Sequence, residues 1–463
     1  MSNYSKEKMK KIIIALIGIL PLSGCHIYQN YERPDVAVSD SLYRPSEWWS
    51  ADTVSVAGLP WRELFRDTCL QALVAEGLRQ NTDLQVARLK VEEAEATLMS
   101  SRLAFLPSLS LEPQGGLSSF DGAKPTKTYT VPVTAGWEID LFGKLRNAKK
   151  GAEAVLRQSQ AYSQAVQTQL LATIADSYYT LLMLDEQYRI SEKTSANWAD
   201  YIRTLKALKK NSTVDETAIA QAEAEKLQVD ASMLSLQQQI QSVENALSVL
   251  LGRTPGPVRR GRLTEQEFPA ELSVGVPLQL LRNRPDIREA EWLLAQAYYT
   301  TNEARAAFYP SITLGGTAGW TNNGGGGIVN PGSWLLEAVA SLVQPLFNRG
   351  TNIARLKISK AQQQEALLQF RQSILDAGSE VNDALTQWQI SRNRQTLDRE
   401  QIASLERALR STELLMKYGT TNYLEVLTAR QSLLQAELTE AEDRFAEIQG
   451  VISLYHALGG GIQ

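Results

Sequence analysis

The chain has 463 residues, 43% of them hydrophobic, which is enough for the cores of two or three ordinary domains. Its formal net charge is −4, and removal of the first 24 residues, which hold four lysines and one glutamate (+3), would lower it to −7. An acidic mature chain offers no basic surface, so nucleic acid is excluded as a partner.

The first 25 residues have the layout of a bacterial secretory signal. Lysines precede an apolar stretch, Ile12 to Leu22, and small residues then lead to a cysteine. The run Leu22-Ser23-Gly24-Cys25 resembles a lipobox, in which the cysteine is lipidated and becomes the first residue after cleavage. We therefore predict a signal peptide at 1–24 and a lipidated segment at 25–60, with an N-acyl group and an S-diacylglycerol on Cys25. An ordinary cleavage site or an uncleaved anchor is the alternative.

Few residues that form disulfides or bind metals remain after this processing. Lipidation of Cys25 leaves Cys69 as the one thiol, so no internal disulfide can form, and we expect Cys69 to be a small buried residue of a helix. His26 and His456 lie at opposite ends of the sequence and predict no metal site. By resemblance to bacterial lipoproteins, His26 directly after the cysteine favours transfer to the outer membrane.

The mature chain contains one unit twice. The seven residues from Leu78 and the eight residues from Ala104 both recur, with similar side chains, 203 positions later. Such a repeat indicates one structural unit used twice. We therefore predict two repeats, 61–252 and 277–460, joined by a linker at 253–276 that is rich in proline and glycine.

Both repeats are predicted to have the same order: a helix, two strands, a long helix and a returning helix. The first helices are expected at 68–104 and 277–307, the strands at 107–119, 128–142, 310–320 and 333–347, and the long helices at 144–209 and 351–417. Pro107 and Pro310 end the first helices. Each long helix could extend on the order of 100 Å, which does not fit inside a compact globule.

The four strand segments resemble membrane strands. They alternate in part, as in Leu109 and Leu111, and tryptophans lie near their ends. Transmembrane strands need about 9 to 11 residues and alternate lipid-facing with lumen-facing side chains. Two soluble hairpins are the alternative. If the strands span a membrane, the chain must oligomerise, because four strands are too few to close a barrel and an open edge is costly in hydrocarbon.

Apolar residues on the returning helices follow the spacings of a coiled coil. They are Leu236, Ile240, Val243, Leu247 and Leu250 in the first repeat, and Leu434, Leu438, Ala441, Phe445, Ile448, Ile452 and Tyr455 in the second. A soluble coiled coil would explain these seams equally well. It would not explain a pair of strands at the same place in both repeats.

Several short motifs, in this order, carry a family resemblance over nearly the whole mature chain. They are Cys25, Tyr31-Glu32-Arg33-Pro34, Trp61-Arg62-Glu63-Leu64-Phe65, the duplicated Phe-x-Pro-Ser segments at 105–108 and 308–311, the run Gly419 to Leu427, and Leu458-Gly459-Gly460-Gly461. With these the chain resembles the outer-membrane factors of the TolC type, in the lipoprotein branch that serves resistance-nodulation-division pumps.

The resemblance implies a fold, partners and a location. The fold is mainly α with a small membrane β-barrel contribution: three copies form a trimeric 12-stranded β-barrel, continued by a periplasmic α-helical barrel. The implied partners are the other copies of a homotrimer, a periplasmic adaptor, an inner-membrane pump and outer-membrane lipid. The implied function is a passive duct for small molecules in the outer membrane. It is not an enzyme, and its one non-protein group is the lipid on Cys25.

The same resemblance implies a gate at the periplasmic tip. Leu424 falls where the family places an apolar constriction, and Glu425 falls near its acidic ring. Thr428 departs from the family, which often has Asp there, so a charge-selective ring at that level is in question. A contact within the coiled coil is the alternative role for Leu424, and a solvated residue at a helix start is the alternative for Glu425.

The tip turns are implied to dock the adaptor. They comprise Asn211, Ser212 and Thr213 in the first repeat and Gly419, Thr420 and Thr421 in the second. We expect Gly419 to take the positive φ of a hairpin turn, and Asn211 to tolerate the same geometry.

Other function classes have less support. No catalytic constellation is recognisable, and the run Gly324 to Gly327 lacks the Lys-Ser or Lys-Thr of a phosphate loop. A duct for type I protein secretion shares the architecture, and an elongated lipoprotein that spaces envelope layers remains a second alternative. A passive duct need not bind its cargo, so the substrate, the pump and the adaptor stay undetermined.

Overall fold

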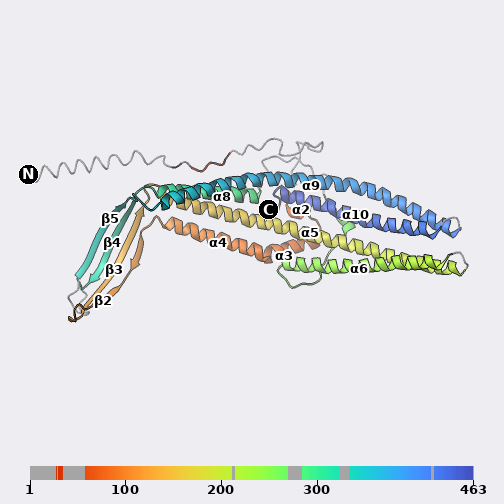
Figure 1. Ribbon diagram of the computed structural model, residues 1–463, viewed down its shortest axis with the longest axis horizontal. Coiled ribbons are helices and arrows are strands. Elements are labelled where there is room, and N and C mark those ends of the chain that lie inside the picture. Colours follow the sequence, from red (N-terminus) through yellow and green to blue (C-terminus); the bar gives the residue numbers. More distant parts are fainter. Residues whose placement is uncertain are drawn as a thin grey trace, which may run out of the picture. The chain divides into compact units, whose positions relative to one another are not determined.

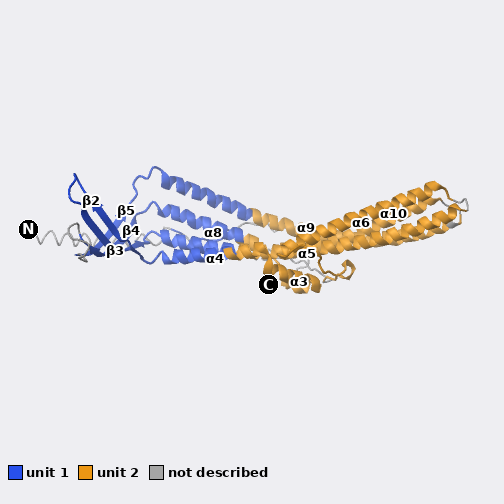
Figure 2. Ribbon diagram, turned by 90° about the horizontal axis from the view of Figure 1, so that it is seen from below, with its two compact units in different colours: residues 1–36, 90–160, 289–371 blue, residues 37–89, 161–288, 372–463 orange. Residues whose placement is uncertain are grey.

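The computed structural model describes residues 28, 30–34, 58–210, 214–268, 284–322, 333–418 and 422–461. The chain divides into two compact units, coloured blue and orange in Figure 2. Unit 1 comprises 1–36, 90–160 and 289–371, and unit 2 comprises 37–89, 161–288 and 372–463. All the strands that the structure describes belong to unit 1. Within the described residues, no helix is long and apolar enough to cross a membrane.

The same order of elements occurs twice along the chain (Figure 1). The first half contains α2 (Trp61–Leu64), α3 (Thr68–Gln80), α4 (Thr82–Leu103), β1 (Ser108–Leu111), β2 (Gln114–Ser118), β3 (Thr126–Ile139), α5 (Lys144–Lys209) and α6 (Glu216–Leu250). After the short 3-10 helix η2 (Leu263–Glu265), the second half contains α8 (Pro285–Ala306), β4 (Ser311–Thr321), β5 (Ser333–Val343), α9 (Thr351–Lys417) and α10 (Tyr423–Ala457).

The helix predictions are confirmed for the long helices and corrected for the first one. The bounds of α5 and α9 coincide with the ranges 144–209 and 351–417. The single helix predicted over 68–104 is wrong, because Asn81 separates α3 from α4. The Asn81 side chain accepts a hydrogen bond from the Leu84 N–H at 2.9 Å and so caps α4, while its amide donates to the Leu250 carbonyl at 2.9 Å.

The first strand is also divided, where one continuous strand was predicted over 107–119. β1 and β2 both pair with β3, and the break between them lies at Glu112 and Pro113. The Glu112 N–H donates to the Pro132 carbonyl at 3.1 Å, so the backbone of Pro132 faces this break. Pro113, in the break, and Pro132, on β3, both lack an N–H. Both strands therefore lose a ladder donor at this point, which interrupts the pairing.

The predicted strands 128–142 and 333–347 end too late. β3 stops at Ile139, and the Asp140 carboxylate that follows it caps the start of α5 by accepting from the N–H groups of Leu145 at 3.1 Å and Arg146 at 2.9 Å. β5 stops at Val343, two residues before Pro345, which has no N–H for a further ladder bond.

The strands form one antiparallel sheet in the order β1-β3-β4-β5, with β2 also on β3. The pairing of β3 with β4 joins the two halves of the chain, with Thr134 opposite Thr317 near its middle. In Figure 1, β2, β3, β4 and β5 lie side by side in the sheet. The sheet is therefore built from strands of both repeats.

The main hydrophobic core lies in unit 2. Its largest fully buried side chains include Phe65, Tyr178, Tyr179 and Tyr455, and the rings of Phe65 and Tyr455 pack edge to face at 6.1 Å. The seams predicted on the returning helices are confirmed here, since Leu247, Ala441, Ile448, Ile452 and Tyr455 are all buried in this core.

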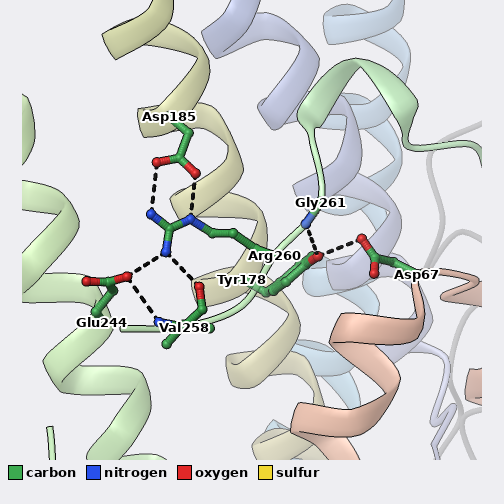
Figure 3. Close-up of polar contacts among 7 residues, drawn as sticks. All are labelled: Asp67, Tyr178, Asp185, Glu244, Val258, Arg260 and Gly261. Atoms are coloured by element: carbon green, nitrogen blue, oxygen red, sulfur yellow. Dashed lines mark hydrogen bonds and ion pairs between the residues drawn. The ribbon is translucent and has the colours of Figure 1, made fainter. Parts of the chain in front are cut away.

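Within unit 2, an ionic network binds the described part of the connection between the repeats to two helices (Figure 3). The guanidinium of Arg260 binds Asp185 of α5 with two hydrogen bonds of 2.5 and 2.9 Å, and binds Glu244 of α6 at 2.5 Å. Glu244 also accepts from the Val258 N–H at 3.1 Å. These two carboxylates raise the pKa of Arg260. One side chain thus attaches the connection to two helices.

A second contact fixes the same connection one residue further on. The Tyr178 hydroxyl of α5 donates to Asp67 at 2.6 Å and accepts from the Gly261 N–H at 3.0 Å. Burial raises the pKa of Tyr178, and the bond to Asp67 raises it further. Asp67 in turn caps α3 through the Cys69 N–H at 2.8 Å. Residues 258–261 are therefore held by side chains from α5, α6 and the start of α3.

Arg260→Leu is expected to release this connection. The change removes the cation that Asp185 and Glu244 share. Loss of a part-buried charged partner costs roughly 1–3 kcal/mol of local stability. Hydrogen exchange followed by mass spectrometry should show faster exchange over 253–268, with the strands unchanged. Arg259→Leu, at an exposed neighbouring position, is the matched control. Equal exchange rates over 253–268 in both variants would contradict the role of Arg260 in holding the connection.

Candidate functional site

One face of the sheet in unit 1 is apolar, apart from Lys127 of β3, which lies opposite Leu117 of β2. The strand register places on it Leu109, Leu111, Val131, Val133, Ala135, Trp137, Ile139, Ile312, Leu314, Gly316, Ala318, Trp320, Trp334, Leu336, Ala338, Ala340 and Leu342. Many of these side chains are open to the surroundings, with Leu336 85% and Leu109 73% exposed. A contiguous exposed apolar surface of this kind requires an apolar environment or a partner.

The opposite face is mostly polar. It carries Ser108, Ser110, Thr130, Pro132, Thr134, Gly136, Glu138, Ser311, Thr313, Gly315, Thr317, Gly319, Thr321, Ser333, Leu335, Glu337, Val339, Ser341 and Val343. The apolar exceptions are concentrated on β5. Because side chains alternate along a strand, the difference between the two faces is a property of the whole sheet.

Both edges of the sheet are open within the described part of the chain. β5 pairs only with β4, and β1 and β2 pair only with β3. Each edge therefore presents a row of backbone N–H and C=O groups that no other described strand satisfies. Such edges bind a further strand readily.

Aromatic side chains lie near both ends of the sheet. The rings of Trp320 and Trp334 meet at 5.1 Å on the apolar face, and the rings of Phe142 and Tyr309 stack at 5.0 Å beyond the opposite ends of β3 and β4. Aromatic residues with one apolar and one polar side are enriched where a membrane meets water.

The described part of the N-terminal segment packs on unit 1 near this second aromatic pair. The Tyr28 ring lies against Gly143, directly before α5. Lys150 donates to the Asn30 side chain at 2.8 Å, and Arg33 pairs with Glu291 at 3.1 Å. Cys25 itself lies outside the described residues, three positions before Tyr28.

The residues predicted for the gate lie at the start of α10 in unit 2. The Asn422 side chain caps the helix by accepting from the N–H groups of Leu424 at 3.0 Å and Glu425 at 3.2 Å. Leu424 is 52% exposed, and Glu425 and Thr428 are exposed as well. The buried residues of this turn are Val426 and Leu427. Leu424 therefore points away from the seam within its own chain.

The predicted tip turns lie outside the described residues. These are Asn211, Ser212 and Thr213 in the first repeat and Gly419, Thr420 and Thr421 in the second. The helices on either side of each turn are described, from α5 to Lys209 and α6 from Glu216, and from α9 to Lys417 and α10 from Tyr423.

A cationic contact that was not expected from the sequence joins three helices next to the tip. The guanidinium of Arg430 on α10 lies 4.8 Å from the Tyr201 ring centroid and 5.7 Å from that of Trp198, both on α5. It also pairs with Glu413 of α9. Burial raises the pKa of Tyr201 to about 12 in spite of the nearby cation. A stacked, paired arginine in an aromatic cluster stabilises the relative placement of these helices.

A pair of buried carboxyl groups lies further along α9 and α10. Asp398 is 8% exposed and Asp443 is 6% exposed. Burial, together with a hydrogen bond and charge repulsion from Asp443, raises the pKa of Asp398 to about 6, while Arg394 opposes the shift. Arg394 lies 2.9 Å from Asp443. A carboxyl group that is buried beside another acid holds its proton more tightly than one in water.

This pair should make the contact between α9 and α10 sensitive to pH. Because the folded state binds the proton more tightly than the unfolded chain, the stabilisation is complete below about pH 4 and is lost as the pH rises through about 6. Hydrogen exchange over 395–401 and 440–446, corrected for intrinsic rates, should accelerate between about pH 5 and pH 8. Asp398→Asn should abolish this dependence. The same pH profile in both proteins would contradict the raised pKa of Asp398.

Comparison with known proteins agrees with this geometry. The family profile described as "Outer membrane efflux protein" matches residues 73–253 and 276–460. The chain is 30% identical over 448 residues to the cation efflux system protein CusC of Escherichia coli K12, covering 96% of this chain and 97% of that protein. It is 29% identical to the probable outer membrane lipoprotein SilC of Salmonella typhimurium, covering 98% and 99%.

Solved structures agree as well. The fold is similar to that of the MtrE outer membrane channel of Neisseria gonorrhoeae in its open state, with a TM-score of 0.85 and 28% identity, over 95% of this chain and 99% of that one. An amphipathic sheet combined with long paired helices thus defines an outer-membrane efflux channel. The chain belongs to the outer membrane efflux protein family, which confirms the resemblance drawn from its motifs.

Proposed function

We propose that three copies of this chain form a passive duct that carries small molecules through the periplasm and the outer membrane. The observation that supports this most is the sheet, with one apolar face, one mostly polar face and two open edges. The apolar face would contact lipid and the polar face would line the lumen. The lumen would continue through barrels of α-helices in the periplasm.

Hydrogen bonding supports closure by further copies. Unpaired backbone groups cost several kcal/mol each in hydrocarbon, so β5 of one copy would pair with β1 and β2 of the next. Since β1 and β2 occupy successive parts of β3, each copy supplies four strand positions. Two copies would close about eight strands, whose interior is filled by side chains. Three copies would close about twelve and leave a passage.

The N-terminal segment is proposed to add a second attachment to the membrane. Cleavage after 1–24 would leave Cys25 with an N-acyl group and an S-diacylglycerol at the start of the segment 25–60. The contact of Tyr28 with Gly143 supports this, because it brings the chain close to the end of the sheet. The repeats 61–252 and 277–460, with the linker 253–276, would form the duct.

Energy for transport is proposed to come from partners. A passive channel performs no work, so an inner-membrane pump of the resistance-nodulation-division class and a periplasmic adaptor would complete the system. The adaptor would dock on the turns 211–213 and 419–421 and bind the dilated tip more tightly than the closed one, which shifts the population towards the open state.

The gate is proposed to be a ring of Leu424 side chains, one from each copy. Its exposure on its own chain supports this, since an exposed leucine at the tip is free to contact other copies. Such a ring narrows and dewets a pore. Glu425 would form an acidic ring beside it, and Thr428 would leave the next turn uncharged.

Leu424→Ser is expected to raise the basal ion conductance of the purified protein in planar bilayers, because a hydroxyl ring is smaller and wets more easily. Leu414→Ser is the matched control, since Leu414 is similarly exposed, at 57%, near the end of α9. A conductance equal to wild type in the Leu424 variant, or an equal rise in both, would count against Leu424 as the constriction.

Loss of the duct should sensitise the cell. A strain without the gene is expected to grow poorly in at least one of a panel of antibiotics, bile salts, dyes and metal cations, with growth restored by the wild-type gene. The secreted proteins of both strains should be compared by mass spectrometry in parallel. Unchanged sensitivity to the whole panel would refute small-molecule efflux, and loss of a secreted protein would point to type I secretion instead.

A further inference from the structure

Glu337 occupies an isolated position on the polar face of the sheet. It lies in the middle of β5, directly opposite Thr317, which in turn is opposite Thr134 and Ser110. The row across the sheet at this level is therefore Ser110, Thr134, Thr317 and Glu337. Three hydroxyl groups and one exposed carboxylate make up this row.

No cation of the described strands lies beside this carboxylate. Along β5 the same face carries Leu335 and Val339, and the positions that flank Thr317 on β4 are Gly315 and Gly319. The other acid of this face differs, because Glu138 pairs with Lys144 at 2.8 Å near the end of β3. Within the strands that the structure describes, Glu337 is thus the acid of the polar face that lacks an ion pair.

A neighbouring copy would bring no cation either. The edge that would pair with β5 is formed by β1, β2 and the two residues between them, and the sequence from Ser108 to Ser118 contains neither Lys nor Arg. It contains one more acid, Glu112. Whatever register the two edges adopt, this edge gives Glu337 no cationic neighbour from the other copy.

We infer that Glu337 from each copy forms a ring of carboxylates inside the membrane section of the duct, which favours the passage of cations over anions. This inference rests on the proposed trimer and on the polar face lining its lumen. It concerns a level of the duct separate from the tip residues Leu424 and Glu425. The ring would bind no particular ion and would act on the charge of whatever passes.

Electrostatics supports a substantial effect. Walls of low dielectric constant focus the field of fixed charges into a water-filled passage. Screening at physiological ionic strength acts over about 8 Å, so a reporter must lie within that distance of the ring. The side chain of Thr317 meets this condition, because directly opposed Cβ atoms in an antiparallel sheet lie about 5 Å apart.

The test measures the local potential with a cysteine at position 317. In a Cys69→Ala background, Thr317→Cys is labelled on the purified, assembled protein with a cationic and, separately, an anionic methanethiosulfonate, and each rate is followed by mass spectrometry. The cationic reagent should react preferentially. Glu337→Gln should lower the ratio of the two rates at least about threefold, while Glu337→Asp should preserve it.

Controls separate the two claims. Ala338→Cys, next to Glu337 but on the apolar face, should react slowly with both reagents. If Thr317→Cys reacts with neither reagent, the polar face does not line a lumen and the proposed function itself fails. If Thr317→Cys reacts but the ratio is the same with Glu337→Gln, the inference is overturned and the duct stands. If Glu337→Gln does not assemble, Glu337→Thr takes its place, because a threonine matches the hydroxyl residues Ser110, Thr134 and Thr317 at the same level of the sheet.

Discussion

The constraint on which the rest of the structure depends is that backbone groups in hydrocarbon must find hydrogen-bond partners. The sheet of this chain satisfies that constraint internally between β1 or β2, β3, β4 and β5, but not at its two edges. Its apolar face suits it to lipid, yet lipid offers the edges no donors or acceptors. In the proposed duct, assembly is therefore a requirement of the membrane section, whereas the helices could pack without it.

The two repeats contribute to this sheet in the same way and are tied together at several levels. In unit 1 the long pairing of β3 with β4 joins them through the backbone. In unit 2 the connection between the repeats is fixed by Arg260 and Tyr178, and the helices next to the tip are joined by Arg430. A duct that opens at its tip would need firm joints elsewhere, so that movement is confined to the hairpin ends.

Much of the fold could be predicted because its signals are periodic and local. The long helices at 144–209 and 351–417 have no internal proline, and their bounds were found to the residue. The break at Asn81 was missed because the asparagine acts through a contact with Leu250, far along the sequence. The division of β1 from β2 was missed because it depends on Pro132 of another strand.

The site shows the same limit. Leu424 and Glu425 were proposed from a short motif, and their exposure agrees with a role at the tip. Arg430 could not be recognised from the sequence, because it acts through contacts with aromatic rings on α5 that only the fold brings near. The sequence indicated the two faces of the sheet only weakly, since small residues such as Gly316 and Ala318 weaken the alternation of apolar and polar side chains along a single strand. The strand register revealed the contrast.

In the proposed duct, one chain cannot complete its own membrane wall. Native mass spectrometry of the lipidated protein, extracted from outer membranes in mild detergent, tests it most directly. A species with three times the mass of one lipidated chain, which dissociates only on heating, is the predicted result. A stable folded monomer under the same conditions, with its strands intact, would contradict the account.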